Sequence, residues 1–449
     1  MENFVFTRNL KKDFPTASHG DGIYLFDEQG NKYTDACGGA VVVSLGYNNR
    51  FIKERIKEQV SKICFAHTGT FINKPIKELS KKIISHLPDN FSKVYFLSGG
   101  SEANETAIKL ARQYFLDNGH KEKRKILSRM VSYHGNTLGV LALSSSPERQ
   151  KNYVRMLKKN HKVAPAYCYR CPFGKSQETC SLECAEHLAE VIRKEGRDTI
   201  AGFIAEPIVG SSGSALVPRE DYFRRVREIC DENDVLLIFD EVMTGMGRTG
   251  KYFAMNHFNV KPDMVSIGKG ISSGYMPLSA LAVGKNIVES IYQKGGIFVN
   301  GFTFSGHALA AEAGNAVFDY MDHNDIISNV RKNSQYLMNR LEEFKEKYAY
   351  IGDVRGKGLM LGMEFVKDEK TKKPFPGKLK LAKRIAEEAF RNRLMIFPGV
   401  RMHVCTDNIS ITESDHLMLA PQFITTREQL DAILETFEKS FTAVMGAVR

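Results

Sequence analysis

Residues 235–242 read VLLIFDEV and residues 264–270 read MVSIGKG, and these two stretches are the clearest indication of the fold class. Each begins with an apolar run rich in β-branched residues and ends in charged residues. Continuous apolar runs of this length are typical of strands that are buried on both faces of a sheet. Similar runs at Val94–Leu97 and Ile200–Ala205 are separated from them by segments with helical periodicity. This alternation predicts an α/β fold with a mainly parallel central sheet.

Composition and charge restrict the class of protein. The chain has 449 residues, 43% of them hydrophobic and 26% charged, which excludes a disordered or fibrous protein. The formal net charge is +11, but the basic residues are spread over amphipathic segments such as 51–63, so we expect no nucleic-acid partner. No stretch approaches the roughly 18 apolar residues of a membrane helix, so we expect no membrane partner. Residues 1–20 lack the pattern of a signal peptide, and we predict a cytoplasmic location.

The two ends of the chain differ from its middle part. Residues 20–46 read as short strands, with a hairpin at the turn Asp27-Glu28-Gln29-Gly30-Asn31. After residue 315 helical patterns dominate, and the last helix has a candidate capping box at Thr425 and Glu428. We predict a large domain of residues 51–314 and a smaller α+β domain formed by residues 1–50 and 315–449.

Polar residues follow the predicted strands at their carboxyl ends, where parallel sheets bind ligands. Val94–Leu97 is followed by Ser98-Gly99-Gly100-Ser101 at the start of a helix. Glycines beside a serine N-cap leave free backbone N–H groups at a helix N-terminus, which suits a phosphate. The segment lacks both the Walker lysine and the dinucleotide fingerprint. The alternative interpretation is an ordinary glycine turn with a cap.

An aromatic residue and two carboxylates follow three further strands. Tyr133 comes after the strand-like segment 126–132 and could stack on a planar ring, or it could simply pack at the surface. Glu206 follows Ile200–Ala205, and Asp240 ends the run at 235–239. Burial of a carboxylate costs free energy unless a cation pairs with it. Glu206 and Asp240 therefore each indicate a bound ligand or, alternatively, an N-cap or a salt bridge.

Lys269 lies between Gly268 and Gly270 at the end of the last strand. A sterically open lysine with a lowered pKa is the amine nucleophile of Schiff-base chemistry, whereas the alternative is a surface lysine in a flexible turn. Together the anion site, the aromatic ring, the carboxylate and the lysine match the needs of pyridoxal phosphate. Its phosphate, ring, ring nitrogen and aldehyde each require one of these groups.

The sequence resembles the class III pyridoxal-phosphate-dependent aminotransferases, of fold type I, over nearly the whole chain. The blocks that carry the resemblance are GDGIYLFDEQGNKYTD (20–35), GGSEANETAIKLAR (99–112), YHGNTLG (133–139), AEPIVGSSG (205–213), FDEVMTGMGRTG (239–250), GYMPLSA (274–280), GFTFSGHALA (301–310) and VRGKGLMLGMEF (354–365). The string YCYRCPFG (167–174) is similar to a subgroup that acts on ω-amino acids, taurine and β-alanine with pyruvate.

The resemblance implies a role for each matching residue. Lys269 would form the Schiff base and carry the proton, and Asp240 would pair with the pyridine nitrogen. Val242 and Tyr133 would lie on the two faces of the ring. The remaining implied residues are Gly100, Ser101 and His134 around the cofactor, Glu206 beside it, and Thr303, which would reach the phosphate of the other subunit. The resemblance therefore implies a homodimer with a shared active site, and it leaves open whether dimers pair into tetramers.

The substrate pocket departs from the family pattern. Many amine-specific members carry a Trp near the position of Val41, and this chain contains no Trp, so the resemblance implies a smaller pocket wall there. Arg401 is the candidate for the family's substrate-carboxylate arginine, although the segment up to Pro421 is longer than usual. Val41 and Arg401 are therefore the predicted substrate-binding residues.

Four cysteines lie close together in the sequence: Cys168, Cys171, Cys180 and Cys184. Four thiolates in a short loop could bind zinc. However, the inner spacing of eight residues is shorter than in common zinc ribbons. We therefore expect a folded surface insertion and no metal.

The resulting functional prediction is a ping-pong aminotransferase that uses pyridoxal phosphate. The donor would be an ω-amino acid, a taurine-like amine or a diamine, and the acceptor an oxo acid, with pyruvate favoured over 2-oxoglutarate. Two alternatives remain open. The same fold hosts racemases, aminomutases and decarboxylases, and a protein of another class could use the glycine turn at 99–101 to bind a nucleotide.

Overall fold

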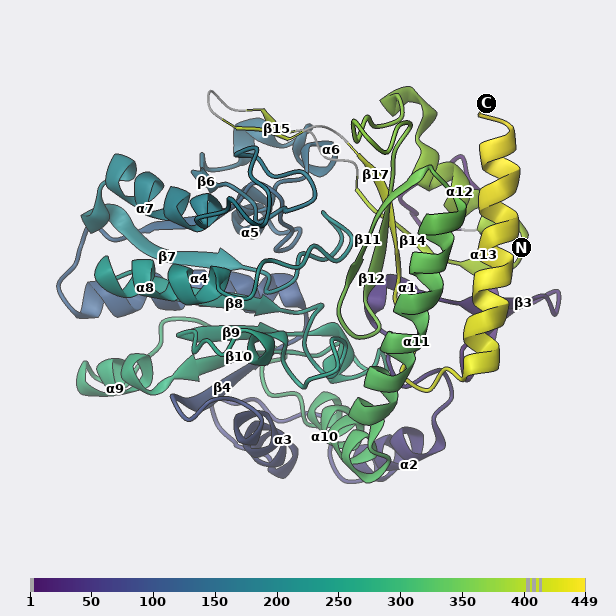
Figure 1. Ribbon diagram of the computed structural model, residues 1–449. Helices are drawn as coiled ribbons and strands as arrows, with labels where there is room; N and C mark the ends of the chain where they lie inside the picture. Colours follow the sequence, from purple (N-terminus) through teal and green to yellow (C-terminus); the bar gives the residue numbers. More distant parts are fainter. Residues whose placement is uncertain (1–3, 401–403, 406–408, 412–413, 449) are drawn as a thin grey trace.

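A seven-stranded sheet forms the centre of the computed structural model, which describes residues 4–400, 404–405, 409–411 and 414–448 (Figure 1). The strand order is β4-β10-β9-β8-β7-β5-β6. The strands are β4 (Phe91–Leu97), β5 (Lys125–Arg129), β6 (Lys162–Val163), β7 (Ile200–Ala205), β8 (Leu236–Glu241), β9 (Met264–Ile267) and β10 (Ser279–Gly284). β10 runs antiparallel to β4 and β9, whereas the other neighbouring pairs are parallel. The predicted α/β fold with a mainly parallel central sheet is confirmed.

Helices cover both faces of this sheet (Figure 1). The helices of this part of the chain are α2 (Arg50–Val60), α3 (Lys74–Ser85), α4 (Gly100–Asp117), α5 (Leu138–Leu143), α6 (Pro147–Gln150), α7 (Glu183–Glu195), α8 (Tyr222–Glu232), α9 (Lys285–Gln293) and α10 (Ala308–His323). Phe239 of β8 shares a core cluster with Phe223 of α8, whereas the preceding Ile238 shares another with Leu110 of α4. Because successive strand residues face opposite sides, the sheet lies between α8 and α4. No helix in the described chain is both long and apolar enough to span a membrane.

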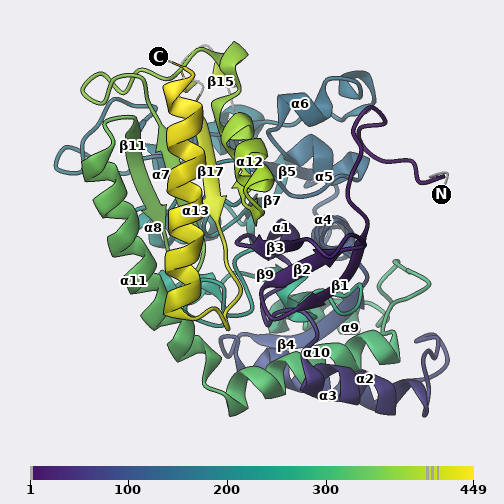
Figure 2. The same cartoon turned by 90° about the vertical axis from the view of Figure 1, so that its right-hand side faces the viewer.

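The two ends of the chain form smaller sheets with their own helices (Figure 2). One sheet has the order β1-β2-β3-β13 and the other β11-β12-β17-β14, with β15 and β16 as a separate pair. The elements are β1 (Ala17–Asp21), β2 (Tyr24–Asp27), β3 (Lys32–Asp35), α1 (Gly38–Val41), α11 (Ile326–Lys347), β11 (Ile351–Gly356), β12 (Leu361–Phe365), α12 (Leu381–Arg391), β13 (Leu394–Met395), β14 (Phe397–Pro398), β15 (Val404–Cys405), β16 (Ser410–Ile411), β17 (Asp415–Leu419) and α13 (Arg427–Gly446). β13 pairs with β3, so the two chain ends share a sheet. The domain limits at residues 50 and 314 stay a prediction.

The predicted hairpin between residues 27 and 31 is confirmed as the turn between β2 and β3. Asp27 Oδ1 accepts hydrogen bonds from the backbone N–H groups of Gln29 at 3.0 Å and Asn31 at 2.8 Å. Gly30 has a φ of +79°, a left-handed conformation that glycine adopts without strain. A short aspartate and a glycine therefore fix this turn locally.

The predicted capping box of the last helix is wrong by one residue. Thr426 is the N-cap: its hydroxyl accepts from the Gln429 backbone N–H at 3.3 Å, and the Gln429 side chain accepts from the Thr426 N–H at 2.9 Å. The Thr425 hydroxyl instead donates to the Gln422 carbonyl at 2.7 Å. That bond ties Thr425 to the preceding turn, so the helix starts one residue later.

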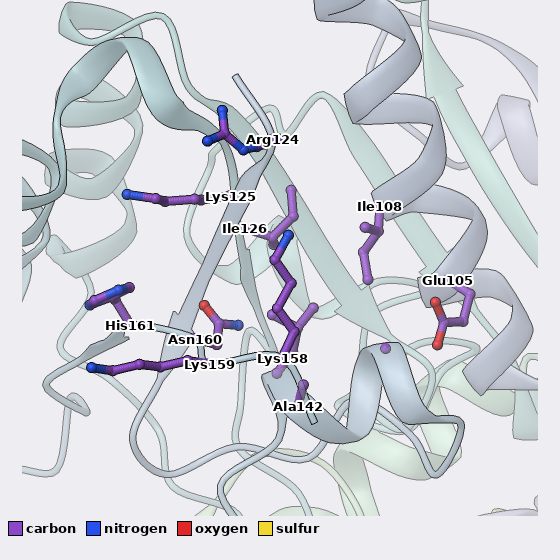
Figure 3. A pocket seen from close by; sticks show the side chains of 12 residues that line it. Glu105, Ile108, Arg124, Lys125, Ile126, Ala142, Lys158, Lys159, Asn160 and His161 are labelled. Atoms are coloured by element: carbon purple, nitrogen blue, oxygen red, sulfur yellow. The ribbon is translucent and has the colours of Figure 1, made fainter. Parts of the chain in front are cut away.

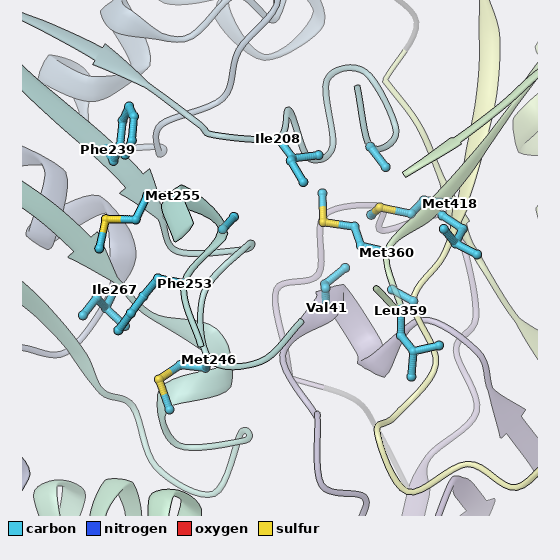
Figure 4. Close-up of a cluster of buried hydrophobic side chains, with 14 of the residues drawn as sticks. Val41, Ile208, Phe239, Met246, Phe253, Met255, Ile267, Leu359, Met360 and Met418 are labelled. Carbon is cyan, nitrogen blue, oxygen red and sulfur yellow. The ribbon is translucent and has the colours of Figure 1, made fainter. Parts of the chain in front are cut away.

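One buried apolar cluster extends from the central sheet into the terminal elements. Figure 4 shows Phe239 and Ile267 near the ends of β8 and β9, with Val41, Met360 and Met418 beyond them. The terminal elements therefore cover the carboxyl edge of the sheet, where the sequence places the charged residues.

Candidate active site

The three charged residues predicted for the site lie at one edge of the central sheet. Glu206 follows β7, Asp240 lies near the end of β8, and Lys269 follows β9 after one glycine. β8 pairs in parallel with both β7 and β9, so the three strands end side by side. The topology thus brings together residues that are distant in the sequence.

Asp240 is 4% exposed, yet its hydrogen bonds do not fill its acceptor positions. Its Oδ2 accepts from His134 Nδ1 at 2.8 Å and from Asn104 Nδ2 at 2.8 Å. Its Oδ1 accepts from the Val242 backbone N–H at 3.1 Å. An ionised carboxylate offers about four acceptor positions, so one on Oδ1 remains for a ligand.

His134 and Asn104 hold this carboxylate in place. Because an ionised carboxylate only accepts, His134 donates from Nδ1, and its buried Nε2 has no partner within the described residues. Asn104 also donates to the His134 carbonyl at 2.7 Å. Asn104 was not predicted from the sequence, although a polar residue beside the apolar stripe of Ala103, Ala107 and Ala111 was a signal for it.

The backbone around Lys269 is strained and tightly packed. Lys269 has a φ of +46°, a conformation that is uncommon for a residue with a side chain. A Cβ on Gly268 would lie 3.1 Å from Val242 Cγ1, and a Cβ on Gly270 would lie 3.1 Å from Met246 Cβ. The glycines on either side of Lys269 therefore let the chain pass close to the loop after β8, and the Lys269 ammonium donates to the Ala40 carbonyl at 2.9 Å.

The surroundings of Lys269 favour its unprotonated form. Burial lowers the pKa of Lys269 to about 8, although the carboxylates of Asp240 and Glu206 act in the opposite direction. The positive charges of Arg248 and Arg149 lower that pKa further. An amine that loses its proton this readily can act as a nucleophile or proton acceptor near neutral pH.

Glu206 joins two loops of the site. It is 5% exposed, and its carboxylate accepts from the backbone N–H groups of Tyr133 at 3.0 Å and Gly210 at 2.8 Å. Burial raises the pKa of Glu206, while the charge of His134 lowers it in part. The residue therefore fixes the turn that carries Tyr133 and His134 against the end of β7.

The predicted anion site lies at the start of α4. Its N-cap is Gly99 and not a serine, so no side chain caps the first N–H groups of this described helix. A Cβ on Gly100 would lie 2.7 Å from Val242 Cγ1, and a Cβ on Gly135 would lie 2.5 Å from Ser101 Oγ. The Ser101 hydroxyl accepts from the Asn136 backbone N–H at 3.0 Å. Gly100, Ser101 and Val242 are thus brought together with the turn after Tyr133.

The other predicted residues are Val41, Thr303 and Arg401. Val41 is buried with a φ of +60° and follows Ala40, the acceptor of the Lys269 hydrogen bond. Thr303 is exposed between α9 and α10. Arg401 lies outside the described residues.

The cysteine loop is bound to the terminal elements. Arg170 Nε lies 2.5 Å from Glu364 Oε1, and the Lys372 ammonium donates to the Tyr169 carbonyl at 2.8 Å. The thiols of Cys168, Cys171, Cys180 and Cys184 are free. In the part of the chain that the structure describes, no group of three or more His, Cys, Asp or Glu residues could hold a metal ion.

A cavity of about 320 Å³ lies behind the anion site, between α4, β5 and the segment 158–161 (Figure 3). Glu105 forms part of its wall and accepts from the Thr137 hydroxyl at 2.7 Å and the Val140 N–H at 3.0 Å. The cavity is thus separate from Asp240 and Lys269, but it shares a wall with the turn after His134.

The groups at the sheet edge fit pyridoxal phosphate. The open acceptor of Asp240 suits a protonated ring nitrogen, the uncapped start of α4 suits a phosphate, and the lysine suits an aldehyde. The close approaches at Gly100 and Gly135 leave no space for a side chain, so glycine at these positions lets the start of α4 pack against Val242 and against the turn after His134.

Comparison with known proteins agrees with this geometry. The sequence pattern of the family described as aminotransferase class-III matches residues 6–441. A diaminobutyrate–2-oxoglutarate transaminase of Halomonas elongata is 33% identical, over 96% of this chain and 90% of the relative. A leucine/methionine racemase of Thermococcus litoralis is 34% identical, over 94% of this chain and 89% of the relative. The PMP-bound form of an aminotransferase from Vibrio fluvialis aligns with a TM-score of 0.91 at 28% identity, over 100% of this chain and 97% of that one. The chain belongs to the class-III aminotransferases, enzymes that use pyridoxal phosphate.

Proposed function

We propose that this aminotransferase takes its amino group from an ω-amino acid, a taurine-like amine or a diamine. The acceptor that we favour is pyruvate, with 2-oxoglutarate as the alternative. The observation that carries the proposal is the position of Lys269 beside Asp240 at neighbouring strand ends, with the pKa of Lys269 lowered to about 8. The string YCYRCPFG (167–174) supports the choice of donor and acceptor by its similarity to enzymes of that specificity.

Each residue at the sheet edge has a part in this proposal. Bound pyridoxal phosphate supplies the aldehyde carbon that receives the amino group and a ring that withdraws electrons from it. The N–H groups at Gly100 and Ser101 bind the phosphate. Asp240 Oδ1 keeps the ring nitrogen protonated, because a nearby carboxylate favours the charged form. Lys269 Nζ, when unprotonated, takes the proton from the donor carbon and returns it during transfer.

The remaining residues hold this arrangement. Val242 and Tyr133 enclose the ring from its two faces. His134 orients the Asp240 carboxylate by the bond at 2.8 Å, and Glu206 holds the turn of Tyr133 by the bond at 3.0 Å. Val41 forms the pocket wall beside Lys269.

We also propose that the active unit is a homodimer in which Thr303 reaches the phosphate in the partner subunit. Exposed apolar side chains lie next to Thr303 in the chain, including Val299 (79% exposed) and Phe304 (57% exposed). Neighbouring exposed apolar groups mark a protein contact. Sedimentation of the purified enzyme should give a dimer, and a fully active monomer would contradict this part of the proposal.

The second candidate is a racemase that uses the same cofactor. The racemase of Thermococcus litoralis favours it, because that enzyme is 34% identical to this chain over most of both lengths. A racemase would use the same proton transfer at Lys269 but would return the proton to the opposite face of the donor carbon. It would therefore release no oxo acid and need no acceptor.

One panel of reactions tests both candidates. The purified, cofactor-loaded enzyme is incubated with β-alanine, 4-aminobutanoate, taurine, 1,4-diaminobutane or L-leucine, each with pyruvate. We expect alanine to accumulate with at least one ω-amino donor, and the Lys269→Ala variant to lose at least about 1000-fold in rate, because it lacks the group that moves the proton. Formation of D-leucine without alanine would favour the racemase, and full turnover by the Lys269→Ala variant would contradict the mechanism.

A further inference from the structure

We infer that Arg149 binds the carboxylate or sulfonate at the far end of the amine donor. The inference rests on the proposed function and deepens it, because it selects ω-amino acids and taurine-like amines over diamines. It is carried by the position of Arg149 over the Tyr133 ring and by the lack of a carboxylate partner for its guanidinium among the described residues.

Arg149 belongs to the short helix α6, and its side chain reaches the ring of Tyr133. Its guanidinium carbon is 4.1 Å from the centroid of the Tyr133 ring. Tyr133 is in turn joined to Glu206 by the backbone bond at 3.0 Å. The positive charge of Arg149 also acts on Lys269, which places it within electrostatic reach of the reacting amine.

The helix that carries Arg149 is firmly attached. Gln150 Nε2 donates to the carbonyls of Leu141 and Ser144, both at 2.8 Å, and the Arg149 backbone N–H donates to the Ser146 carbonyl at 3.0 Å. α6 is thereby tied to the end of α5. A guanidinium on a fixed backbone loses less conformational freedom when it binds a ligand, which is a requirement for a specific anion site.

Apart from its contact with the Tyr133 ring, the Arg149 guanidinium remains available for an anion. Arg149 is half-buried, and no carboxylate within the described residues pairs with it. The other arginine that acts on Lys269, Arg248, is 2% exposed and donates to the carbonyls of Leu359 at 2.8 Å and Pro421 at 2.7 Å. Of these two arginines, Arg149 is the one that a substrate can reach.

The chemistry of a guanidinium defines the ligand. Arg binds carboxylates and sulfonates through paired N–H donors, and its charge repels an ammonium group. A donor that presents its amine to Lys269 and an anionic end to Arg149 is therefore favoured. A diamine, which presents a second cation, is disfavoured.

The experiment compares two amines of similar length with different ends, 4-aminobutanoate and butylamine. The amine half-reaction of the loaded enzyme is followed by absorbance, without an oxo acid. We expect Arg149→Gln to lower kcat/KM for 4-aminobutanoate by about 10- to 100-fold, the usual value of a hydrogen bond to a charged group. The rate with butylamine should change less than about twofold, because a neutral end makes no such bond.

The controls distinguish binding of the substrate anion by Arg149 from structural support of Tyr133. Arg149→Lys should keep part of the preference, and Arg155→Gln, which removes the same charge from the exposed turn nearby, should change neither rate. An equal loss with both amines would mean that Arg149 only supports Tyr133, and it would overturn the inference. Unchanged rates in the Arg149→Gln variant would overturn it as well.

A binding measurement distinguishes this inference from the proposed function. Glutarate has two carboxylates and no amine, so calorimetry can record its binding without any reaction. If the wild-type enzyme reacts with no amine, the proposed function fails. In that case, loss of glutarate binding in Arg149→Gln would still support the anion site, and equal binding by both proteins would exclude it.

Discussion

In the described part of the chain, Asp240 and Glu364 are both buried carboxylates with three hydrogen-bond donors each, but the donors differ in charge. Glu364 is fully buried, and its oxygens meet Arg170 at 2.5 Å, Arg355 at 2.7 Å and the Tyr167 hydroxyl. Asp240 accepts from a side-chain amide, an imidazole and a backbone N–H, and no guanidinium contacts it within the described residues. Burial alone therefore does not mark a site. A carboxylate whose charge is saturated by two guanidiniums holds the structure together, whereas one without a guanidinium partner can receive a cationic group of a ligand.

Of the variants that test this comparison, the one that removes the carboxylate of Glu364 should cause the largest change. Glu364→Ala leaves Arg170 and Arg355 buried without their main counter-charge, so we expect a loss of about 3–5 kcal/mol in the free energy of unfolding. Turnover per loaded site should stay near that of the wild type. Chemical unfolding followed by circular dichroism gives the first quantity and the amine half-reaction gives the second. Glu435→Ala, at an exposed position of α13, should change neither.

Asp240→Asn should show the reverse pattern with a somewhat smaller effect. An amide keeps the shape of the carboxylate, so the unfolding midpoint should move little. The charge that would keep the ring nitrogen protonated is lost, and removal of such an electrostatic group costs about 100- to 1000-fold in rate. The measurement is kcat/KM with the best donor of the panel, at equal cofactor loading. If Asp240→Asn unfolded easily and kept its rate, the two carboxylates would have been assigned the wrong way round.

The sequence predicted the elements whose signals are local. β7 and β9 have the predicted bounds Ile200–Ala205 and Met264–Ile267, because strands buried on both faces need continuous apolar runs. β10 (Ser279–Gly284) was not recognised as a strand, since its small residues do not form a typical β-branched run. Pairing with β4 and β9 defines it, and β4 is distant in the sequence.

The residues of the candidate site could likewise be predicted only where their signal is local in the sequence. Glu206, Asp240 and Lys269 could be predicted because each follows its own strand, and parallel strands end at one edge. Asn104 and Arg149 could not be assigned, because their partners Asp240 and Tyr133 lie elsewhere in the chain. A helix stripe or a turn sequence carries no information on which distant side chain it will face.

The smallest expected effect concerns the pH dependence of the saturated carboxylate. Burial alone would raise the pKa of Glu364, but Arg355 and Arg170 hold this pKa down to about 2, below the ordinary 4.5. A lowered pKa in the folded state gives stability that is present above the unfolded-state value and is lost as the pH falls toward the folded one. The gap in unfolding free energy between the wild type and Glu364→Gln should therefore be constant above about pH 5 and close toward about pH 2.

Glu241 provides a control with the opposite sign. Burial raises the pKa of Glu241 to about 7, although it accepts from the backbone N–H groups of Ala254 at 2.9 Å and Met255 at 2.7 Å. A raised pKa gives stability that is present below about pH 4.5 and is lost as the pH rises toward about 7. Between about pH 4.5 and 7, the free energy of unfolding of the wild type should thus fall relative to that of Glu241→Gln. The difference in unfolding free energy between the wild type and Glu364→Gln should stay constant above about pH 5. If both gaps moved in the same direction, the pH dependence would reflect the general charge of the chain, and the assignment of Glu364 as a paired, ionised group would have to be withdrawn.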